Sequence, residues 1–146
     1  MTFAEAMPTM LRHAGRWDGV YRHVARDFTL IDEHRMRTVC EFPGEGPHAY
    51  VQHNRLEWPD GRVEEYSFPG VFDGELLRWD TERFSGFGWE AHGVVMLRLD
   101  RKDVADAYFT EMIELSADGQ SRARTWQWFE GGHPTRRTLC DEVRIA

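Results

Sequence analysis

Most of the chain alternates hydrophobic and polar residues in short runs that turn residues separate. A period of two places successive side chains on opposite faces of a strand, so these runs predict an antiparallel meander. Turn-favouring residues such as Pro59-Asp60-Gly61 and Asp73-Gly74 lie between them. The runs that we interpret as strands are 16–25, 29–42, 49–58, 62–68, 75–79, 83–91, 94–100, 108–115, 122–130 and 135–145. The segment 101–107 is left open as either a helical turn or a loop.

The first fourteen residues carry a helical pattern instead. Thr2 and Glu5 have the spacing of a capping box, and Gly15 stands where a helix would end. Pro8 interrupts the run, so we expect a short helix that starts near Pro8 or bends there. This helix would serve as a lid or plug on the strands that follow.

About ten such strands would leave exposed edges in an open sheet, and closing the sheet on itself removes them. The sequence therefore predicts an all-β fold: a single antiparallel up-and-down β-barrel of about 8–10 strands with a short N-terminal helix. One domain accounts for residues 1–146, with 1–14 as the helix or lid and 15–146 as the barrel. A barrel of this size can enclose one small ligand.

The first and the last predicted strands carry side chains that can stack on each other. Gly15-Arg16-Trp17 opens the first strand, and the last strand carries Arg137 and Arg144. A guanidinium group stacks favourably on an indole ring. We therefore expect Trp17, Arg137 and Arg144 to close one end of the barrel.

Composition narrows the class of partner. The net charge of −7 argues against nucleic acid as a partner, because phosphates require clustered basic residues. The sequence contains no run of eighteen apolar residues and no secretory signal, so we expect no membrane partner and a cytoplasmic location. Cys40 and Cys140 lack the spacing of a metal or redox motif and are expected to be reduced thiols. The oligomeric state stays open, with a homodimer among the alternatives.

Two strands have faces that could bind a ligand. In 49–58, Tyr50, Gln52 and Asn54 share one face, and amides inside a barrel must find partners or hold a polar ligand atom. In 122–130, Arg124 and Trp126 share a face suited to an anionic or aromatic ligand. In both strands, the alternative is that this face points to solvent. The residues that we predict to bind a ligand are Tyr50, Gln52, Asn54, Trp89, Tyr108, Arg124 and Trp126.

Acid–base chemistry would need a carboxylate or histidine inside the barrel. The candidates are Glu111, Glu90, His48 and His92, with a structural ion pair as the alternative role for Glu111. None of the seven histidines forms a His-x-His or His-Glu-x-x-His motif. We therefore predict no metal site and no cofactor.

With these residues in view, the chain resembles the calycin superfamily, the barrel type of lipocalins and fatty-acid-binding proteins. The resemblance is carried by Gly15-Arg16-Trp17 and a C-terminal arginine. Three segments are similar to an uncharacterised group of bacterial lipocalin-like domains: Trp17-Asp18-Gly19-Val20-Tyr21, Gln52-His53-Asn54-Arg55, and Arg122-Ala123-Arg124-Thr125-Trp126 with the strand after it. The resemblance implies a barrel with an internal cavity and supplies no catalytic residue.

We therefore expect the barrel to bind a small hydrophobic, aromatic or amphipathic molecule. The alternative is a cofactor-independent isomerase, cyclase, lyase or dehydratase that uses a histidine and a carboxylate in the same cavity. A protein-interaction module is a third alternative, which would show a cavity filled by tryptophans and an exposed apolar patch.

Overall fold

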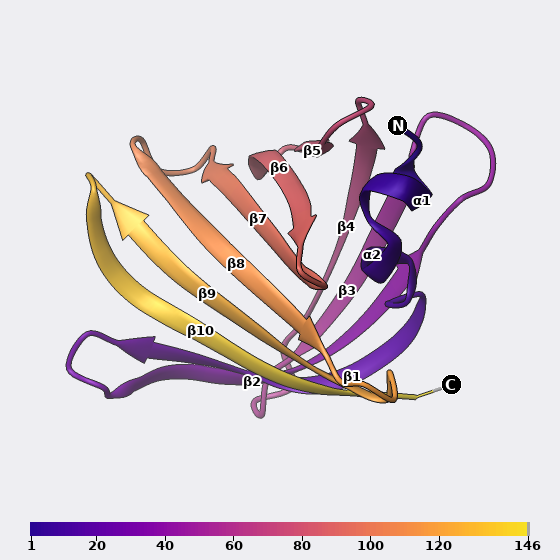
Figure 1. The fold of residues 1–146 in the computed structure, drawn as a ribbon. Coiled ribbons are helices and arrows are strands. Elements are labelled where there is room, and N and C mark those ends of the chain that lie inside the picture. The colour runs from indigo at the N-terminus through magenta and orange to yellow at the C-terminus, as the bar shows by residue number, and fades with distance from the viewer. Residues whose placement is uncertain (146) are drawn as a thin grey trace.

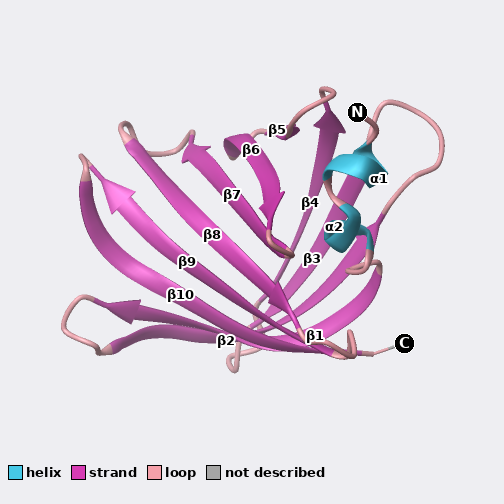
Figure 2. Ribbon diagram, in the orientation of Figure 1, coloured by secondary structure: helices cyan, strands magenta, loops and turns pink. Residues whose placement is uncertain are grey.

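The computed structural model describes residues 1–145, which form two short helices and ten strands (Figures 1 and 2). In chain order the elements are α1 (Phe3–Ala6), α2 (Pro8–Leu11), β1 (Gly15–Ala25), β2 (Leu30–Glu41), β3 (Tyr50–Glu57), β4 (Val63–Phe72), β5 (Leu77–Asp80), β6 (Phe84–Ala91), β7 (Val94–Arg101), β8 (Ala107–Leu115), β9 (Ser121–Glu130) and β10 (His133–Arg144). Residues 102–106, where a helical turn or a loop was expected, form a loop. Neither helix is long and apolar enough to span a membrane.

The ten strands form one closed antiparallel barrel in which each strand pairs with its neighbours in sequence. Closure is made by β1, which pairs with β2 on one side and with β10 on the other, where Trp17 faces Arg144. The predicted all-β, up-and-down barrel is therefore confirmed. Each predicted strand corresponds to an observed one because the turn residues that separate them also end the hydrogen-bonded ladders.

Alternation along each strand assigns one face to the interior. In β1 and β8 the buried residues recur at every second position, as in Ala107, Phe109, Glu111 and Ile113. The inner face also carries polar and charged side chains, so it is not a uniform apolar core. This arrangement creates both the core and the site described below.

The N-terminal helices close one end of the barrel. The predicted capping box is present, since Thr2 and Glu5 each accept the other's backbone N–H. The helix is divided at Met7, and Pro8 occupies the first turn of α2, where its missing N–H costs nothing. The Glu90 carboxylate of β6 accepts the next two backbone N–H groups of α2, both at 2.9 Å. This carboxylate ties the helix to the barrel.

The opposite end of the barrel is bordered by the β1–β2, β3–β4, β5–β6, β7–β8 and β9–β10 connections. Strand β6 can approach β7 closely because Gly86 has no side chain: a Cβ atom there would lie 2.0 Å from the Arg98 carbonyl oxygen. The Trp79 ring of β5 packs beside Gly88, a second glycine of β6. The glycines of β6 therefore permit the local coiling of the barrel wall.

Candidate functional site

The barrel contains a cavity of about 280 Å³ that its inner-facing side chains enclose. Its volume is close to the lower end of the range found for small-molecule sites. Both Met10 of α2, from the closed end, and Trp128 of β9, from the opposite end, line it. The cavity therefore extends along the interior of the barrel.

Aromatic rings form much of the cavity wall. The Tyr21 and Trp126 rings lie 4.9 Å apart, and Phe109 packs 4.6 Å from Trp128 and edge-on at 5.4 Å to Phe84. These distances fall within the favourable range for aromatic pairs. These rings pack against one another and form the apolar part of the wall.

A row of polar groups crosses this wall on β3. The Tyr50 hydroxyl donates to Gln52 Oε1 at 2.8 Å, and Gln52 Nε2 donates to Asn54 Oδ1 at 2.9 Å. The Thr38 hydroxyl also donates to Asn54 Oδ1, at 3.3 Å. This row uses the amide oxygen of Asn54, while its Nδ2 group has no hydrogen-bond partner among residues 1–145. The Asn54 amide nitrogen is therefore a donor that a bound molecule can use.

Two buried ion pairs lie side by side next to these groups. Arg124 Nε donates to Glu111 at 2.9 Å, and Arg122 donates to both carboxylate oxygens of Glu142, at 2.9 and 3.3 Å. Arg124 Nη1 also lies 3.6 Å from Glu142. Burial raises the pKa of Glu111, and the positive charge of Arg124 opposes that rise. The four charges offset one another within the barrel.

At the closed end, Trp17 is fully buried between two guanidinium groups. The carbon atoms at their centres lie 4.5 Å (Arg122) and 4.4 Å (Arg144) from the centre of the Trp17 ring. The indole N–H donates to the His13 carbonyl oxygen at 2.9 Å. Arg137 is exposed and has no part in this contact, because it pairs with Val24 at the other end of β1 and its neighbour Thr138 is the residue that faces inward. Arg122 of β9 provides the second guanidinium in its place.

Three further arginines stack on aromatic rings that line the cavity. They lie at the open end of the barrel, opposite the helices. Arg62 lies 3.9 Å from the Trp58 ring, Arg83 4.0 Å from Tyr66, and Arg136 4.5 Å from Trp128. None of the three forms an ion pair with a carboxylate of residues 1–145. These guanidinium groups lie at the mouth of the cavity, where the carboxylates of Asp32 and Glu64 also line the wall.

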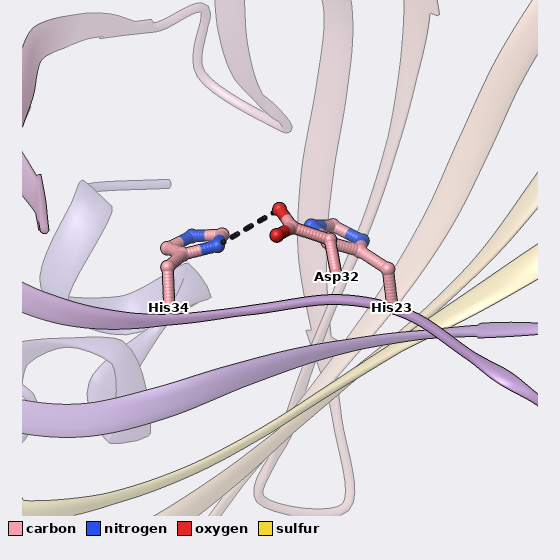
Figure 3. A group of neighbouring side chains, drawn as sticks. All are labelled: His23, Asp32 and His34. Atoms are coloured by element: carbon pink, nitrogen blue, oxygen red, sulfur yellow. Dashed lines mark ion pairs between the residues drawn. The ribbon is translucent and has the colours of Figure 1, made fainter. Parts of the chain in front are cut away.

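His23, Asp32 and His34 form a compact group near the same end (Figure 3). His34 Nδ1 lies 3.5 Å from an Asp32 oxygen, and the His34 ring lies between Tyr21 and Trp58, with ring centres 5.0 and 4.5 Å away. Burial lowers the pKa of both histidines, to about 4 for His23. All three side chains line the cavity.

Comparison with known proteins gives structural matches only. No protein-family model and no curated protein matches the chain. Three solved structures share its architecture. A protein of unknown function of the DUF3598 family from Nostoc punctiforme matches with a TM-score of 0.68 and 14% identity over 93% of this chain, which spans about half (49%) of that protein's length.

The other two structures are matched over almost their full length. The S-type phycobiliprotein lyase CPES from Guillardia theta has a TM-score of 0.73 and 14% identity, covering 100% of this chain and 99% of its own. Rv2717c from M. tuberculosis has a TM-score of 0.63 and 15% identity, covering 99% and 100%. The likeness concerns the fold. A ten-stranded closed barrel fits the calycin-like architecture that the sequence suggested.

This barrel brings most of the predicted ligand-binding residues together. Trp89 and Tyr108 are the exceptions, because the inner positions of their strands belong to their sequence neighbours. Trp89 packs against Phe87, and Tyr108 stacks on Phe129 beneath Arg98, on the outside of the barrel. The predicted residues that line the cavity are Tyr50, Gln52, Asn54, Arg124 and Trp126.

The proposed acid–base residues are not assembled in the cavity. Glu111 lines it but is paired with Arg124. Glu90 caps α2, His92 occupies the β6–β7 turn with φ of 52°, and His48 lies in the loop before β3. Among residues 1–145, none of these last three contributes to the cavity lining.

Sequence reasoning missed several groups of the cavity, including Tyr21, His23, His34 and Trp58. A signal for two of them was available: Tyr21 and His23 have the same parity as Trp17, whose burial was expected. Extending that parity along the first strand would have placed both side chains inside the barrel. The partners on β2 required the strand register, which the sequence alone does not specify.

Proposed function

We propose that this protein is a calycin-like binding protein whose cavity takes a small aromatic or amphipathic molecule with an acidic group. The observation that carries the proposal is the cavity of about 280 Å³ inside the barrel, with aromatic rings in its wall and the unpartnered Asn54 amide nitrogen. A mostly apolar pocket with a few placed polar groups is the usual form of a small-molecule site. Because tryptophans line the cavity without filling it, an interaction module with a solid interior is disfavoured.

The acidic group is argued from the mouth of the cavity. Arg62, Arg83 and Arg136 lie there without a salt-bridge partner in residues 1–145, each over an aromatic ring. Guanidinium groups bind carboxylates through paired N–H donors, and stacking reduces the side-chain freedom lost on binding. A ligand with its ring inside the barrel would leave its acidic group at these arginines.

The comparisons support a binding role through fold alone. The Guillardia theta protein is named as a phycobiliprotein lyase, so a barrel of this architecture is compatible with a lyase as well as with a carrier. Here Glu111 is engaged by Arg124, and Glu90, His48 and His92 lie outside the cavity lining. No observation favours the enzymatic alternative over binding.

The test uses two probes of the same shape, one anionic and one neutral. Native mass spectrometry would record the protein with 2-naphthoate and, separately, with the neutral 2-naphthamide. We expect one naphthoate per chain and weaker retention of the amide, with Arg136→Met and Arg83→Met reducing the difference. Equal retention of the acid and the amide would remove the acidic group from the proposal, and the absence of any 1:1 complex at millimolar probe would remove the binding function.

A further inference from the structure

The His23–Asp32–His34 group is built by the pairing of two strands. His23 of β1 lies directly opposite Asp32 of β2, and Tyr21 lies opposite His34. Because alternate residues share a face, both β2 side chains point to the same interior as His23 (Figure 3). One nitrogen or oxygen atom from each residue lies within 4.8 Å of the other two.

His34 shows that this group is not complete by itself. The residue is 3% exposed, and neither ring nitrogen has a hydrogen-bond partner among residues 1–145. The Asp32 carboxylate comes within 3.5 Å of Nδ1 but does not form a hydrogen bond with it. Buried polar atoms are almost always paired, so an unpaired imidazole beside a carboxylate points to a missing partner.

The neighbouring groups hold two of the three side chains in place. His23 Nδ1 lies 2.7 Å from the Thr138 hydroxyl, which also accepts the Trp128 indole N–H at 2.7 Å. This contact leaves Nε2 of His23 for another partner. Trp58 donates its indole N–H to the Asp32 carboxylate at 3.0 Å. Metal-binding histidines and carboxylates are typically oriented by outer hydrogen bonds of this kind.

We propose that His23, Asp32 and His34 bind one divalent first-row transition metal ion, of which Zn²⁺ is the reference case. Two imidazoles and a carboxylate form a donor set used for such ions, with Zn–N and Zn–O distances of about 2.0–2.2 Å. The three atoms now lie within 4.8 Å of one another and would move closer together to reach such distances from one ion. Oxygen-preferring Mg²⁺ and Ca²⁺ fit this set less well.

The charged side chains around the group are two arginines and two carboxylates, so they leave room for a cation. Arg62 and Arg136 lie near the group and oppose a cation, whereas Glu64 of the cavity lining adds a second carboxylate to Asp32. The three ligands come from one side of the barrel wall, so the remaining coordination positions face the cavity. If the proposed function holds, an oxygen or nitrogen atom of the bound molecule would complete the coordination there.

The experiment titrates metal-depleted protein with Zn²⁺ in competition with a chromophoric chelator and, separately, with Co²⁺ by visible absorption. We expect saturation at one ion per chain. His34→Phe, which keeps the ring stacking, and Asp32→Asn should each weaken Zn²⁺ binding at least about 100-fold, and Thr138→Val and Trp58→Phe about 10- to 100-fold. The control is His53→Phe, which removes an exposed histidine that contacts Glu41 on the outer face and should leave Zn²⁺ affinity unchanged.

Two results would overturn the metal site. One is the absence of saturable binding at one equivalent in the native protein. The other is unchanged Zn²⁺ affinity in both His34→Phe and Asp32→Asn, with thermal melting confirming that these variants fold. Binding of 2-naphthoate to chelator-treated protein is measured alongside. Naphthoate binding without Zn²⁺ binding rejects the metal site alone, and Zn²⁺ binding without naphthoate binding rejects the proposed function alone.

Discussion

Arg124 Nε donates to the Glu111 carboxylate at 2.9 Å, and both side chains are buried in the wall of the cavity. They come from the adjacent strands β9 and β8. A charge in this position has little water to solvate it, so each residue depends on the other. The pair therefore gives the cavity a polar wall without net charge.

Glu111→Gln tests this dependence. The substitution leaves the Arg124 guanidinium buried with only the more distant Glu142 carboxylate, at 3.6 Å, to offset its charge. We expect the free energy of unfolding to fall by about 3–5 kcal/mol, measured by urea denaturation.

The matched double variant, Glu111→Leu with Arg124→Met, removes both charges and should be closer to the native protein in stability than Glu111→Gln is. A loss below about 1 kcal/mol in Glu111→Gln would mean that the ion pair is not buried as described.

Two tryptophans distinguish the inside of the barrel from the outside. Trp126 lies 4.9 Å from Tyr21 on the cavity wall, whereas Trp89 packs against Phe87 on the outer face. Trp126→Phe should weaken 2-naphthoate binding about 10-fold, because the ligand loses apolar contact area. Trp89→Phe makes the same chemical change and should leave the affinity unaltered. Equal effects of the two substitutions in a calorimetric titration would contradict the cavity assignment.

Asn54→Leu addresses the polar side of the cavity. It removes the unpartnered Nδ2 donor and also the acceptor for Gln52 and Thr38. We expect weaker binding of 2-naphthoate together with about 1–3 kcal/mol lower stability, because the Gln52 amide loses its partner. Full retention of naphthoate affinity in the folded variant would show that Asn54 makes no ligand contact.

Two arginines on β10 allow a direct test of barrel closure. Arg144 stacks on Trp17 and donates to the backbone carbonyl oxygens of Gly119, at 2.9 Å, and Arg12, at 2.7 Å. Arg144→Met should lower the free energy of unfolding by about 2–4 kcal/mol. Arg137→Met, on the exposed face of the same strand, should change it by less than about 0.5 kcal/mol. Similar urea midpoints for the two variants would contradict the closure by Arg144.

His13 makes stability depend on pH. Its Nδ1 atom accepts from Arg122 at 3.2 Å, and burial followed by the charge of Arg122 lowers its pKa from 6.5 to about 3. Between these two pKa values, His13 therefore binds a proton in the unfolded chain and not in the folded chain. The stabilising contribution is complete above the unfolded pKa of 6.5 and is lost as the pH falls toward 3.

The replacement His13→Gln removes this proton while its amide oxygen can still accept from Arg122. Between about pH 6 and pH 4, the loss of stability with falling pH should be smaller in the variant by about 1.4 kcal/mol per pH unit. Parallel pH profiles in urea denaturation would show that His13 titrates alike in the folded and unfolded chains.

The fold could be predicted from local patterns in the sequence. Alternation and turn residues such as Pro59-Asp60-Gly61 located the strands, and strand edges required closure. Which face of a strand with polar residues on both sides points inward was harder to predict. In β3, both faces carry polar residues, and Gln52 and Asn54 share the inward face with Tyr50, where side-chain hydrogen bonds link the three. Parity alone contains no such information.

The candidate site depended still more on tertiary arrangement. Trp89 was predicted to face the cavity, yet Phe84 sets the parity of β6 and places Trp89 outside. His23 and His34 are eleven positions apart and match no metal motif, and the β1–β2 register alone brings them together. Side chains gathered across strands in this way leave no spacing signal in the sequence.

The measurement that tests the binding cavity most directly is a fluorescence titration with 8-anilinonaphthalene-1-sulfonate, an aromatic anion that brightens in apolar surroundings. Leu97 lines the cavity, so Leu97→Trp fills part of it, whereas Val143→Trp adds the same ring at an exposed position on β10. Saturable 1:1 binding by the native protein and by Val143→Trp, lost in a folded Leu97→Trp variant, is the predicted result. Equal binding by all three proteins would place the dye on the outer surface and contradict a binding cavity inside the barrel.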